Sequence, residues 1–181
     1  MDASLTAPRY RELRPEELDE AQRRIFDDIA QPRAGAVPAP FHIYLESPEL
    51  CELVQSLGAF CRYRTGLPPR LSEIAILTTA AFWEAEYEFG VHAKEARKVG
   101  VTDAEIAAIG RGDRPDFTDQ DAALVYDLAA TFYRERDVPD VLFETATARF
   151  GRRTVVELTG LLGYYSMLAI ALRMFRVPPP A

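Results

Sequence analysis

The spacing of its apolar residues constrains the fold of this chain most strongly. Apolar side chains recur mainly at intervals of three and four residues, and sustained alternation of apolar and polar residues is scarce. Pro15–Ala30, for example, places Leu18, Ile25 and Ile29 on one face of a helix. Such intervals match the period of an α-helix and not that of a β-strand. The sequence therefore predicts an all-α fold.

Prolines, glycines and capping residues divide the chain into about eight helices. Ser47 caps a helix that has Pro48 at its first position, and Thr102 forms a capping box with Glu105. Thr118 is the expected cap of a later helix, and the proline-containing segment 31–41 is expected to be a loop. The predicted helices span about residues 15–30, 48–64, 70–82, 84–99, 103–110, 119–136, 139–150 and 154–176.

Length and charge restrict the class of protein. With 181 residues and 48% hydrophobic content, we expect a single domain over 1–181, with an N-terminal arm to about residue 40 and a core over about 41–176. The net charge of −7 argues against sequence-independent nucleic-acid binding. The start MDASLTAPRY lacks a signal-peptide pattern, and LTGLLGYYSMLAIAL (158–172) is too short and polar for a membrane span. We therefore expect a cytoplasmic protein with no membrane or nucleic-acid partner.

Two further features concern packing. The last predicted helix carries Gly160, Gly163, Ala169 and Ala171, small residues that permit close helix packing, including packing across a subunit interface. Cys51 and Cys61 lie on one predicted helix with a rise of roughly 15 Å between them, so they cannot form a disulfide within it. We expect both thiols to be buried among apolar residues.

The segment EAEYEFGVH (84–92) raises the functional question. Glu84, Glu88 and His92 are spaced to form one stripe along a helix. The simpler interpretation is a solvated stripe, in which the Glu88–His92 pair contributes a few tenths of a kcal/mol. Aromatic residues interleave with the charged ones, however, and the preceding apolar helix holds a lone carboxylate, Glu73. These observations favour a site.

The segment PRLSEIAILTTAAFWEAEYEFGVHAKEARKVGVTDAEIAAI resembles the core motif of the carboxymuconolactone decarboxylase family, which includes the alkylhydroperoxidase-D-type proteins. The resemblance extends from about Phe41 to Phe175 and implies an alkylhydroperoxidase-D-like helical bundle that assembles as a homo-oligomer, a trimer or a hexamer. The matching positions are Arg70, Glu73, Tyr87-Glu88-Phe89, His92, Ala96 and Gly100.

The chain departs from the peroxidase members at the thiol positions. Those relatives carry a C-x-x-C pair, and Ala85 and Glu88 stand at its two cysteine positions here. Peroxide reduction needs a reactive thiolate, and neither Cys51 nor Cys61 is near in sequence. The chain thus resembles the decarboxylase-type branch that lacks the cysteine pair.

That branch implies a lyase or isomerase that needs no cofactor and acts on a small carboxylated cyclic compound, as in aromatic catabolism. His92, Glu73 and Glu88 are the candidate catalytic residues, because imidazole donates and accepts protons near neutral pH and a neighbouring carboxylate orients it. The candidate substrate-binding residues are Arg70, which suits a substrate carboxylate, together with Tyr87 and His42. For Arg70 an ion pair with Glu73 is the structural alternative.

Other interpretations stay open at this point. The chain also fits a non-catalytic oligomeric scaffold or binding member of the family and, less well, a thiol peroxidase. A metal site built from Glu73, Glu84, Glu88 and His92 is chemically possible. The chain lacks the doubled Glu-x-x-His motif of carboxylate-bridged bundles, so we expect no metal. For Trp83 and the pair Tyr164-Tyr165 we expect packing roles.

Overall fold

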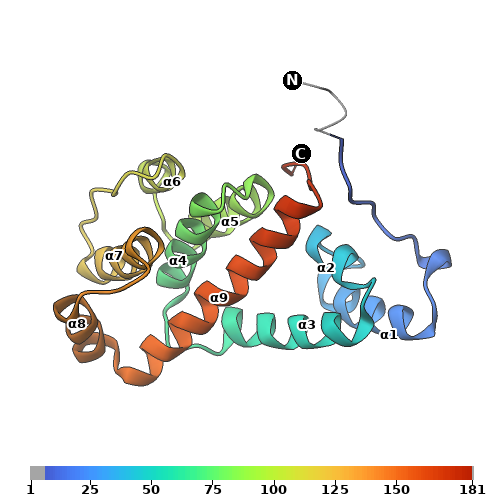
Figure 1. The fold of residues 1–181 in the computed structure, drawn as a ribbon, viewed down its shortest axis with the longest axis horizontal. Coiled ribbons are helices and arrows are strands. Elements are labelled where there is room, and N and C mark those ends of the chain that lie inside the picture. Colours follow the sequence, from blue (N-terminus) through green and yellow to red (C-terminus); the bar gives the residue numbers. More distant parts are fainter. Residues whose placement is uncertain (1–6, 181) are drawn as a thin grey trace.

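A computed structural model describes residues 7–180 of the protein (Figure 1). Within that range the chain forms nine α-helices, two short 3₁₀ helices and no β-strand, which confirms the predicted all-α fold. The 3₁₀ helices are Pro15–Glu17 and Gln31–Arg33. The α-helices are α1 (Glu20–Ala30), α2 (Ala39–Tyr44), α3 (Pro48–Tyr63), α4 (Pro69–Phe82), α5 (Glu86–Lys98), α6 (Asp103–Gly110), α7 (Gln120–Glu135), α8 (Asp140–Phe150) and α9 (Arg152–Met174).

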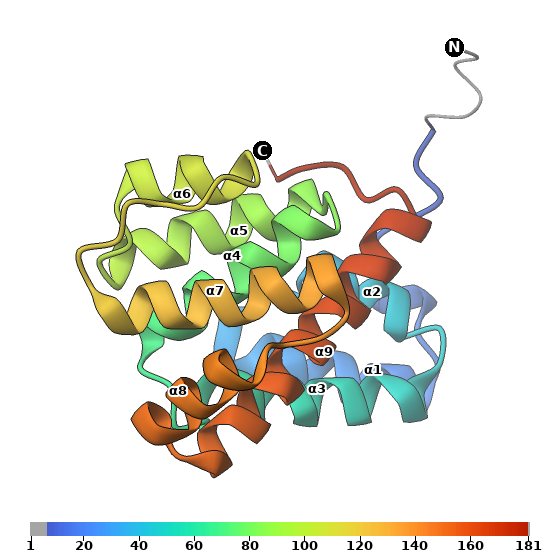
Figure 2. The ribbon, with the colours of Figure 1, turned by 60° about the vertical axis from the view of Figure 1, so that its left-hand side comes forward.

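Helix α4 lies at the centre of the bundle and packs against α5, α7 and α9. The long helix α9 runs diagonally through the molecule, with α4 to α8 on one side and α1 to α3 on the other (Figures 1 and 2). On the second side, α1 packs against α3 and buries Ile25 and Ile29. A direct link between the two sides is the hydrogen bond from the amide of Ala39 in α2 to the hydroxyl of Tyr87 in α5, at 3.3 Å.

The central position of α4 follows from its sequence. Every residue from Leu71 to Ala80 is buried, as expected for a helix that is apolar on all sides. Thr78 and Thr79 satisfy their hydroxyl groups by donating to backbone carbonyls one turn earlier, at 2.7 and 2.8 Å. Glu73 is the one charged residue in this buried stretch, and it is only 7% exposed. A carboxylate in such a place needs a partner.

The structure corrects the predicted stripe at Glu84. Helix α4 ends at Phe82, and the amide of Ala85 donates to the carbonyl of Ala80 in the turn that follows. Glu84 adopts a left-handed conformation with φ of 50° in this turn, before α5 begins at Glu86. Its carboxylate contacts Arg173 of α9 at 3.2 Å. Glu84 therefore does not continue the helical face of Glu88 and His92.

Several predicted boundaries also differ. Asp19 caps α1, so the first predicted helix is not continuous, and the expected loop over 31–41 contains a 3₁₀ turn and the start of α2. Asp119, and not Thr118, caps α7 with its side chain. Ser47 precedes α3 as expected, but its side chain makes no capping hydrogen bond. The capping box at the start of α6 is confirmed.

Helix α9 is longer than the apolar segment 158–172 considered above. Its 23 residues include a window with mean hydropathy of 1.6, so by length and composition alone it is able to cross a membrane. Of that window, 61% is buried inside the molecule, as in the core helix of a folded domain.

Gly160 and Gly163 lie on the open face of α9, whereas the other two small residues, Ala169 and Ala171, are buried in the core. A Cβ atom added at Gly160 or Gly163 would meet nothing within 4 Å. Val156 and Met174 lie on the same face and are 61% and 62% exposed. Within residues 7–180 no helix covers this small-residue face, so the close packing that it permits is left for another molecule. The homo-oligomer remains a prediction.

We expect the protein to have a solution mass that is a multiple of its 20.3 kDa chain. Gly163→Arg should lower that mass, because a long charged side chain prevents close approach at the open face of α9. Light scattering after size exclusion measures the mass, and an unchanged helical circular dichroism spectrum is the control. A monodisperse monomer at micromolar concentration would contradict the prediction.

Candidate functional site

A short buried hydrogen bond joins α4 to α5. Nδ1 of His92 lies 2.7 Å from Oε2 of Glu73, and the two side chains are 7% and 10% exposed. Because the carboxylate oxygen accepts, Nδ1 carries the hydrogen and Nε2 is the ring nitrogen that remains for other chemistry. The bond supplies the partner that the lone acid of α4 requires, so the solvated-stripe interpretation fails for His92.

Tyr165 of α9 holds the imidazole from a second direction. The two rings meet edge to face, with centroids 5.0 Å apart and an interplanar angle of 89°. Glu73 therefore fixes one nitrogen of His92 while Tyr165 restricts the tilt of its ring. This arrangement presents the second nitrogen in a defined direction.

Glu88 lies one turn before His92 on α5, and its carboxyl has a different environment from that of Glu73. Its side chain is buried, and among the described residues no group forms a hydrogen bond with Oε2. Burial raises the pKa of this carboxyl well above the ordinary value of 4.5. Burial thus favours the protonated form of Glu88, which is able to donate a hydrogen bond.

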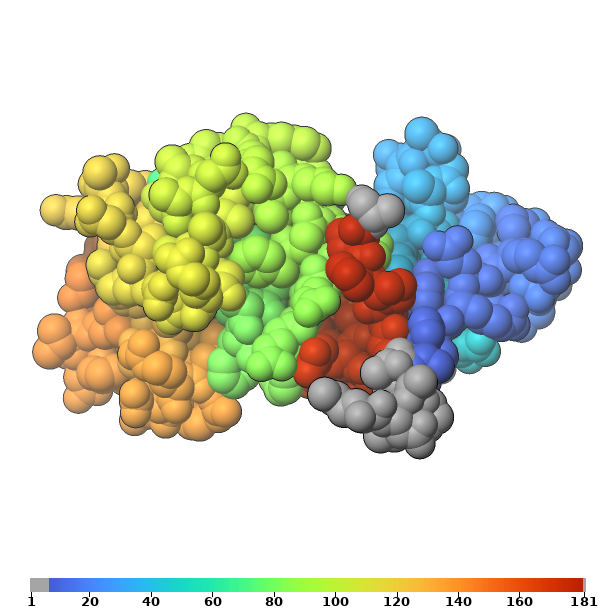
Figure 3. Space-filling view, turned by 90° about the horizontal axis from the view of Figure 1, so that it is seen from above, coloured from blue at the N-terminus to red at the C-terminus, as the bar shows by residue number. Residues whose placement is uncertain are grey.

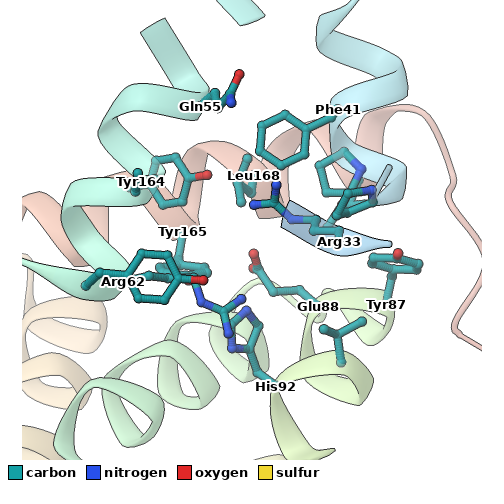
Figure 4. Close-up of a pocket in the computed structure, with 17 residues that line it drawn as sticks. Arg33, Phe41, Gln55, Arg62, Tyr87, Glu88, His92, Tyr164, Tyr165 and Leu168 are labelled. Carbon is teal, nitrogen blue, oxygen red and sulfur yellow. The ribbon is translucent and has the colours of Figure 1, made fainter. Parts of the chain in front are cut away.

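Glu88 and His92 line a cavity of about 120 Å³ between α3, α5, α9 and the segment 33–41. We call it the His92 cavity. In Figure 4 the Glu88 carboxyl points into its centre and His92 lies beneath it. The wall formed by α3 depends on Gly58, because a Cβ atom there would overlap the hydroxyl of Tyr164. The remaining wall includes Arg33, Phe41, Gln55, Arg62, Tyr87, Tyr164, Tyr165 and Leu168.

The predicted site residues divide into two groups. Glu88, His92 and Tyr87 line the cavity, and Glu73 acts on it through His92. Arg70 and His42 lie elsewhere, which corrects the expectation that they sit beside His92. The Arg70 guanidinium pairs with Glu105 of α6 at 2.7 Å, and the Glu73 carboxylate is instead bonded to His92.

His42 contacts the N-terminal segment and does not line the cavity. Its Nδ1 accepts a hydrogen bond from the amide of Leu13 at 3.0 Å, and its ring meets Tyr10 and Phe26 edge to face. The four candidate metal ligands do not form one cluster, because the carboxylate of Glu84 contacts Arg173 instead. Residues 7–180 contain no cluster of three His, Cys, Asp or Glu side chains positioned to hold a metal ion.

Sequence reasoning missed the two arginines of the cavity. Arg62 approaches His92 from α3, and Arg33 reaches in from the opposite side (Figure 4). Helical spacing offered one signal, since Gln55, Gly58 and Arg62 recur at intervals of three and four along α3. Tyr164 and Tyr165 are buried, in keeping with the predicted packing role, and they line the cavity as well.

The cysteines lie apart from the cavity. Cys51 and Cys61 are fully buried and unpaired, as expected. Burial raises the pKa of the Cys51 thiol to about 12 and that of the Cys61 thiol to about 11. Neither thiol has the low pKa or the exposure of a reactive cysteine.

Comparison with known families supports the resemblance seen in the sequence. Residues 48–126, under half of the chain, match the family described as carboxymuconolactone decarboxylase. The matching segment runs from the start of α3 into α7, so it contains Arg62, Glu73, Glu88 and His92. No curated protein matches the chain.

Solved structures share the fold at low sequence identity. The alkylhydroperoxidase AhpD core of an uncharacterized peroxidase-related protein from Ralstonia eutropha JMP134 gives a TM-score of 0.79 at 16% identity, covering 96% of this chain and 92% of that one. A putative antioxidant defence protein AhpD from Agrobacterium tumefaciens gives 0.66 at 23% identity, covering 76% and 95%. A debrominase in complex with 2,3,4-tribromopyrrole gives 0.74 at 13% identity, covering 98% and 92%. These structures place the chain in the alkylhydroperoxidase-D-like fold.

The buried Glu88 carboxyl makes stability depend on pH. Its raised pKa means that its contribution is fully present below about pH 4.5 and is lost as pH rises through the folded-state pKa. Glu88→Gln removes this loss. From pH 5 upward, the free energy of unfolding of the variant should therefore rise relative to that of wild type by up to about 1.4 kcal/mol per pH unit. Urea unfolding between pH 5 and pH 9 measures the difference. The matched control Glu86→Gln alters an exposed acid of the same helix and should keep the wild-type slope. Equal slopes for Glu88→Gln and wild type would show that Glu88 is ionised.

Proposed function

We propose that the protein is a lyase or isomerase acting on a small carboxylated cyclic compound. The proposal follows from the match of residues 48–126 to the carboxymuconolactone decarboxylase family. The observation that carries the proposal is the buried Glu73–His92 hydrogen bond at the edge of a cavity that also holds the Glu88 carboxyl, whose pKa is raised by burial. Paired acids and bases in one cavity, with their protonation states set by their surroundings, are typical of proton-transfer sites.

His92 carries the proton in the proposed reaction. In a decarboxylation the bond from the ring to the carboxylate breaks, its electron pair enters a dienolate conjugated with the ring carbonyl, and CO₂ leaves. The protonated imidazole then delivers its Nε2 proton to the dienolate carbon and recovers a proton from water. In a double-bond shift the same nitrogen removes a proton from one carbon and returns it to another. General acid–base catalysis of this kind contributes about 10²–10⁴-fold.

The two glutamates have separate tasks. Glu73 positions the imidazole through the hydrogen bond to Nδ1. Glu88, as a neutral acid, donates a hydrogen bond to the oxyanion that develops on the ring carbonyl. A protonated carboxylic acid suits this task because it brings no negative charge near the developing one.

The size of the cavity restricts the substrate. Its volume of about 120 Å³ lies below the roughly 300–1,000 Å³ of pockets for drug-sized ligands. A compound with one small ring fits this volume better than a nucleotide or a long acyl chain. The absence of a thiol from the cavity wall among the described residues gives peroxidase chemistry no support.

Substitution of His92 tests the proposal. We expect wild type to consume carboxymuconolactone with release of CO₂ and incorporation of solvent deuterium, followed by NMR. His92→Gln should lose at least about tenfold in turnover, because the amide keeps a donor to Glu73 but carries no transferable proton. Its unfolding midpoint should change little.

The chain offers a matched control, since His42 is its other histidine. His42→Gln alters a residue that lies outside the cavity and should keep wild-type turnover. If folded wild type neither decarboxylates nor isomerises carboxylated lactones, the enzyme proposal fails, and the non-catalytic scaffold becomes the better interpretation.

The cysteines provide an independent test of the redox alternative. The double variant Cys51→Ala/Cys61→Ala should keep turnover within about twofold of wild type, because neither buried thiol is reactive or reaches the cavity. Turnover is compared at matched folded fraction, measured by circular dichroism. Loss of activity in the folded double variant would favour thiol chemistry.

A further inference from the structure

We propose that Arg62 and Arg33 form an anion subsite in the His92 cavity, and that this subsite holds a carboxylate that stays on the substrate during the reaction. The inference rests on the proposed function for the identity of the ligand as the substrate. The subsite itself rests on the placement and charge of the two arginines.

The two guanidinium groups enter the cavity from opposite walls. Arg62 belongs to α3, and its guanidinium carbon lies 5.8 Å from the centroid of the Tyr63 ring. Arg33 belongs to the 3₁₀ turn before α2, and its Nη1 donates to the carbonyl of Ile29 at 2.7 Å. That bond and a contact with the Phe41 ring at 5.9 Å anchor Arg33. Among the described residues, no other hydrogen bond engages the remaining N–H groups of Arg33.

Neither of these two cations forms an ion pair. Among residues 7–180, no carboxylate oxygen lies within 4.0 Å of a nitrogen of Arg33 or Arg62. Glu73 and Glu95 act on Arg62 only at longer range. The carboxyl in the centre of the cavity is that of Glu88, and burial raises its pKa well above the usual value, which disfavours its charge. The two guanidinium groups therefore share a small space without a contacting anion, and a bound anion is able to pair with both.

The chemistry of the guanidinium group favours a carboxylate as this anion. Its planar N–H groups match the two oxygens of a carboxylate and form paired, charge-assisted hydrogen bonds. The small volume of the cavity favours a small anion over polyphosphates and nucleotides. The substrate class is thus a small ring compound that carries a carboxylate substituent.

The bound carboxylate is not the one that leaves. A guanidinium stabilises a carboxylate in the ground state, and this stabilisation is lost when the group becomes neutral CO₂, so binding there would raise the barrier. A carboxylate that remains on the product keeps its interaction throughout. The subsite therefore selects substrates with a second, permanent carboxylate, or substrates that isomerise without losing one.

Arg62 and Arg33 thus take the carboxylate-binding role that the sequence predicted for Arg70. That residue is held by Glu105 of α6 at 2.7 Å. Arg62 lies on α3, ahead of the quoted core motif in sequence, and it reaches the cavity because α3 packs against α9.

A matched pair of probes tests the subsite in the full-length protein by titration calorimetry. 2-Furoate carries a carboxylate on a five-membered ring, and 2-furamide is its neutral near-isostere. We expect furoate to bind at least about tenfold more tightly than furamide. Arg62→Gln should weaken furoate binding at least about tenfold and leave furamide binding unchanged, whereas Arg62→Lys should retain part of the selectivity because it keeps the charge.

One further variant serves as a control. Arg64→Gln alters a neighbouring arginine that packs over Phe60 and does not line the cavity, so it should leave both affinities unchanged. Glu88→Gln is a second test and not a control, because Glu88 lines the cavity itself. A tenfold gain in furoate affinity in Glu88→Gln would show that an ionised Glu88 balances the arginines, and would overturn the inference. Circular dichroism midpoints confirm that each variant is folded.

The outcomes separate this inference from the proposed function. Equal affinities for furoate and furamide, or furoate binding that does not depend on Arg62, would overturn the subsite even if His92-dependent turnover is found. Arg62-dependent furoate binding without turnover of any carboxylated lactone would support the anion subsite and contradict the enzyme proposal.

Discussion

The hydrogen bond between Glu73 and His92 is the interaction on which the site depends. Helix α4 is buried on all sides, and an unpaired carboxylate there would cost several kcal/mol. His92 removes this penalty and in doing so fixes α5 against α4 at a defined rotation. That rotation turns Glu88, one turn earlier, into the cavity. The packing of the core and the arrangement of the cavity residues thus both depend on this one hydrogen bond.

Surroundings, and not residue type, give the two buried glutamates different properties. Glu73 has an imidazole partner at 2.7 Å, whereas Oε2 of Glu88 has no partner among the described residues and the pKa of Glu88 is raised by burial. One acid therefore orients a base, and burial favours the protonated form of the other. Such divergence between two like residues is how a single fold supports both acid and base at one pH.

The sequence was most informative where local rules decide the structure. Helical spacing predicted the all-α fold, and it placed Glu88 and His92 on one face because both lie inside α5. Local rules failed where the structure is determined by packing between helices that are distant in sequence. Glu84 leaves the helix in a left-handed turn and contacts Arg173 of α9, Glu105 of α6 takes Arg70 away from the site, and the amide of Leu13 occupies His42. The role of Arg62 depends on how α3 packs, which its own sequence does not reveal.

The absence of a side chain at Gly58 has a consequence for how this cavity can diverge. Since a single methyl group there would overlap the Tyr164 hydroxyl, any larger residue must displace that phenol ring. Position 58 lies on α3, whereas the Glu73–His92 hydrogen bond joins α4 to α5. One codon change at position 58 would therefore reshape the wall of the cavity and leave that hydrogen bond in place.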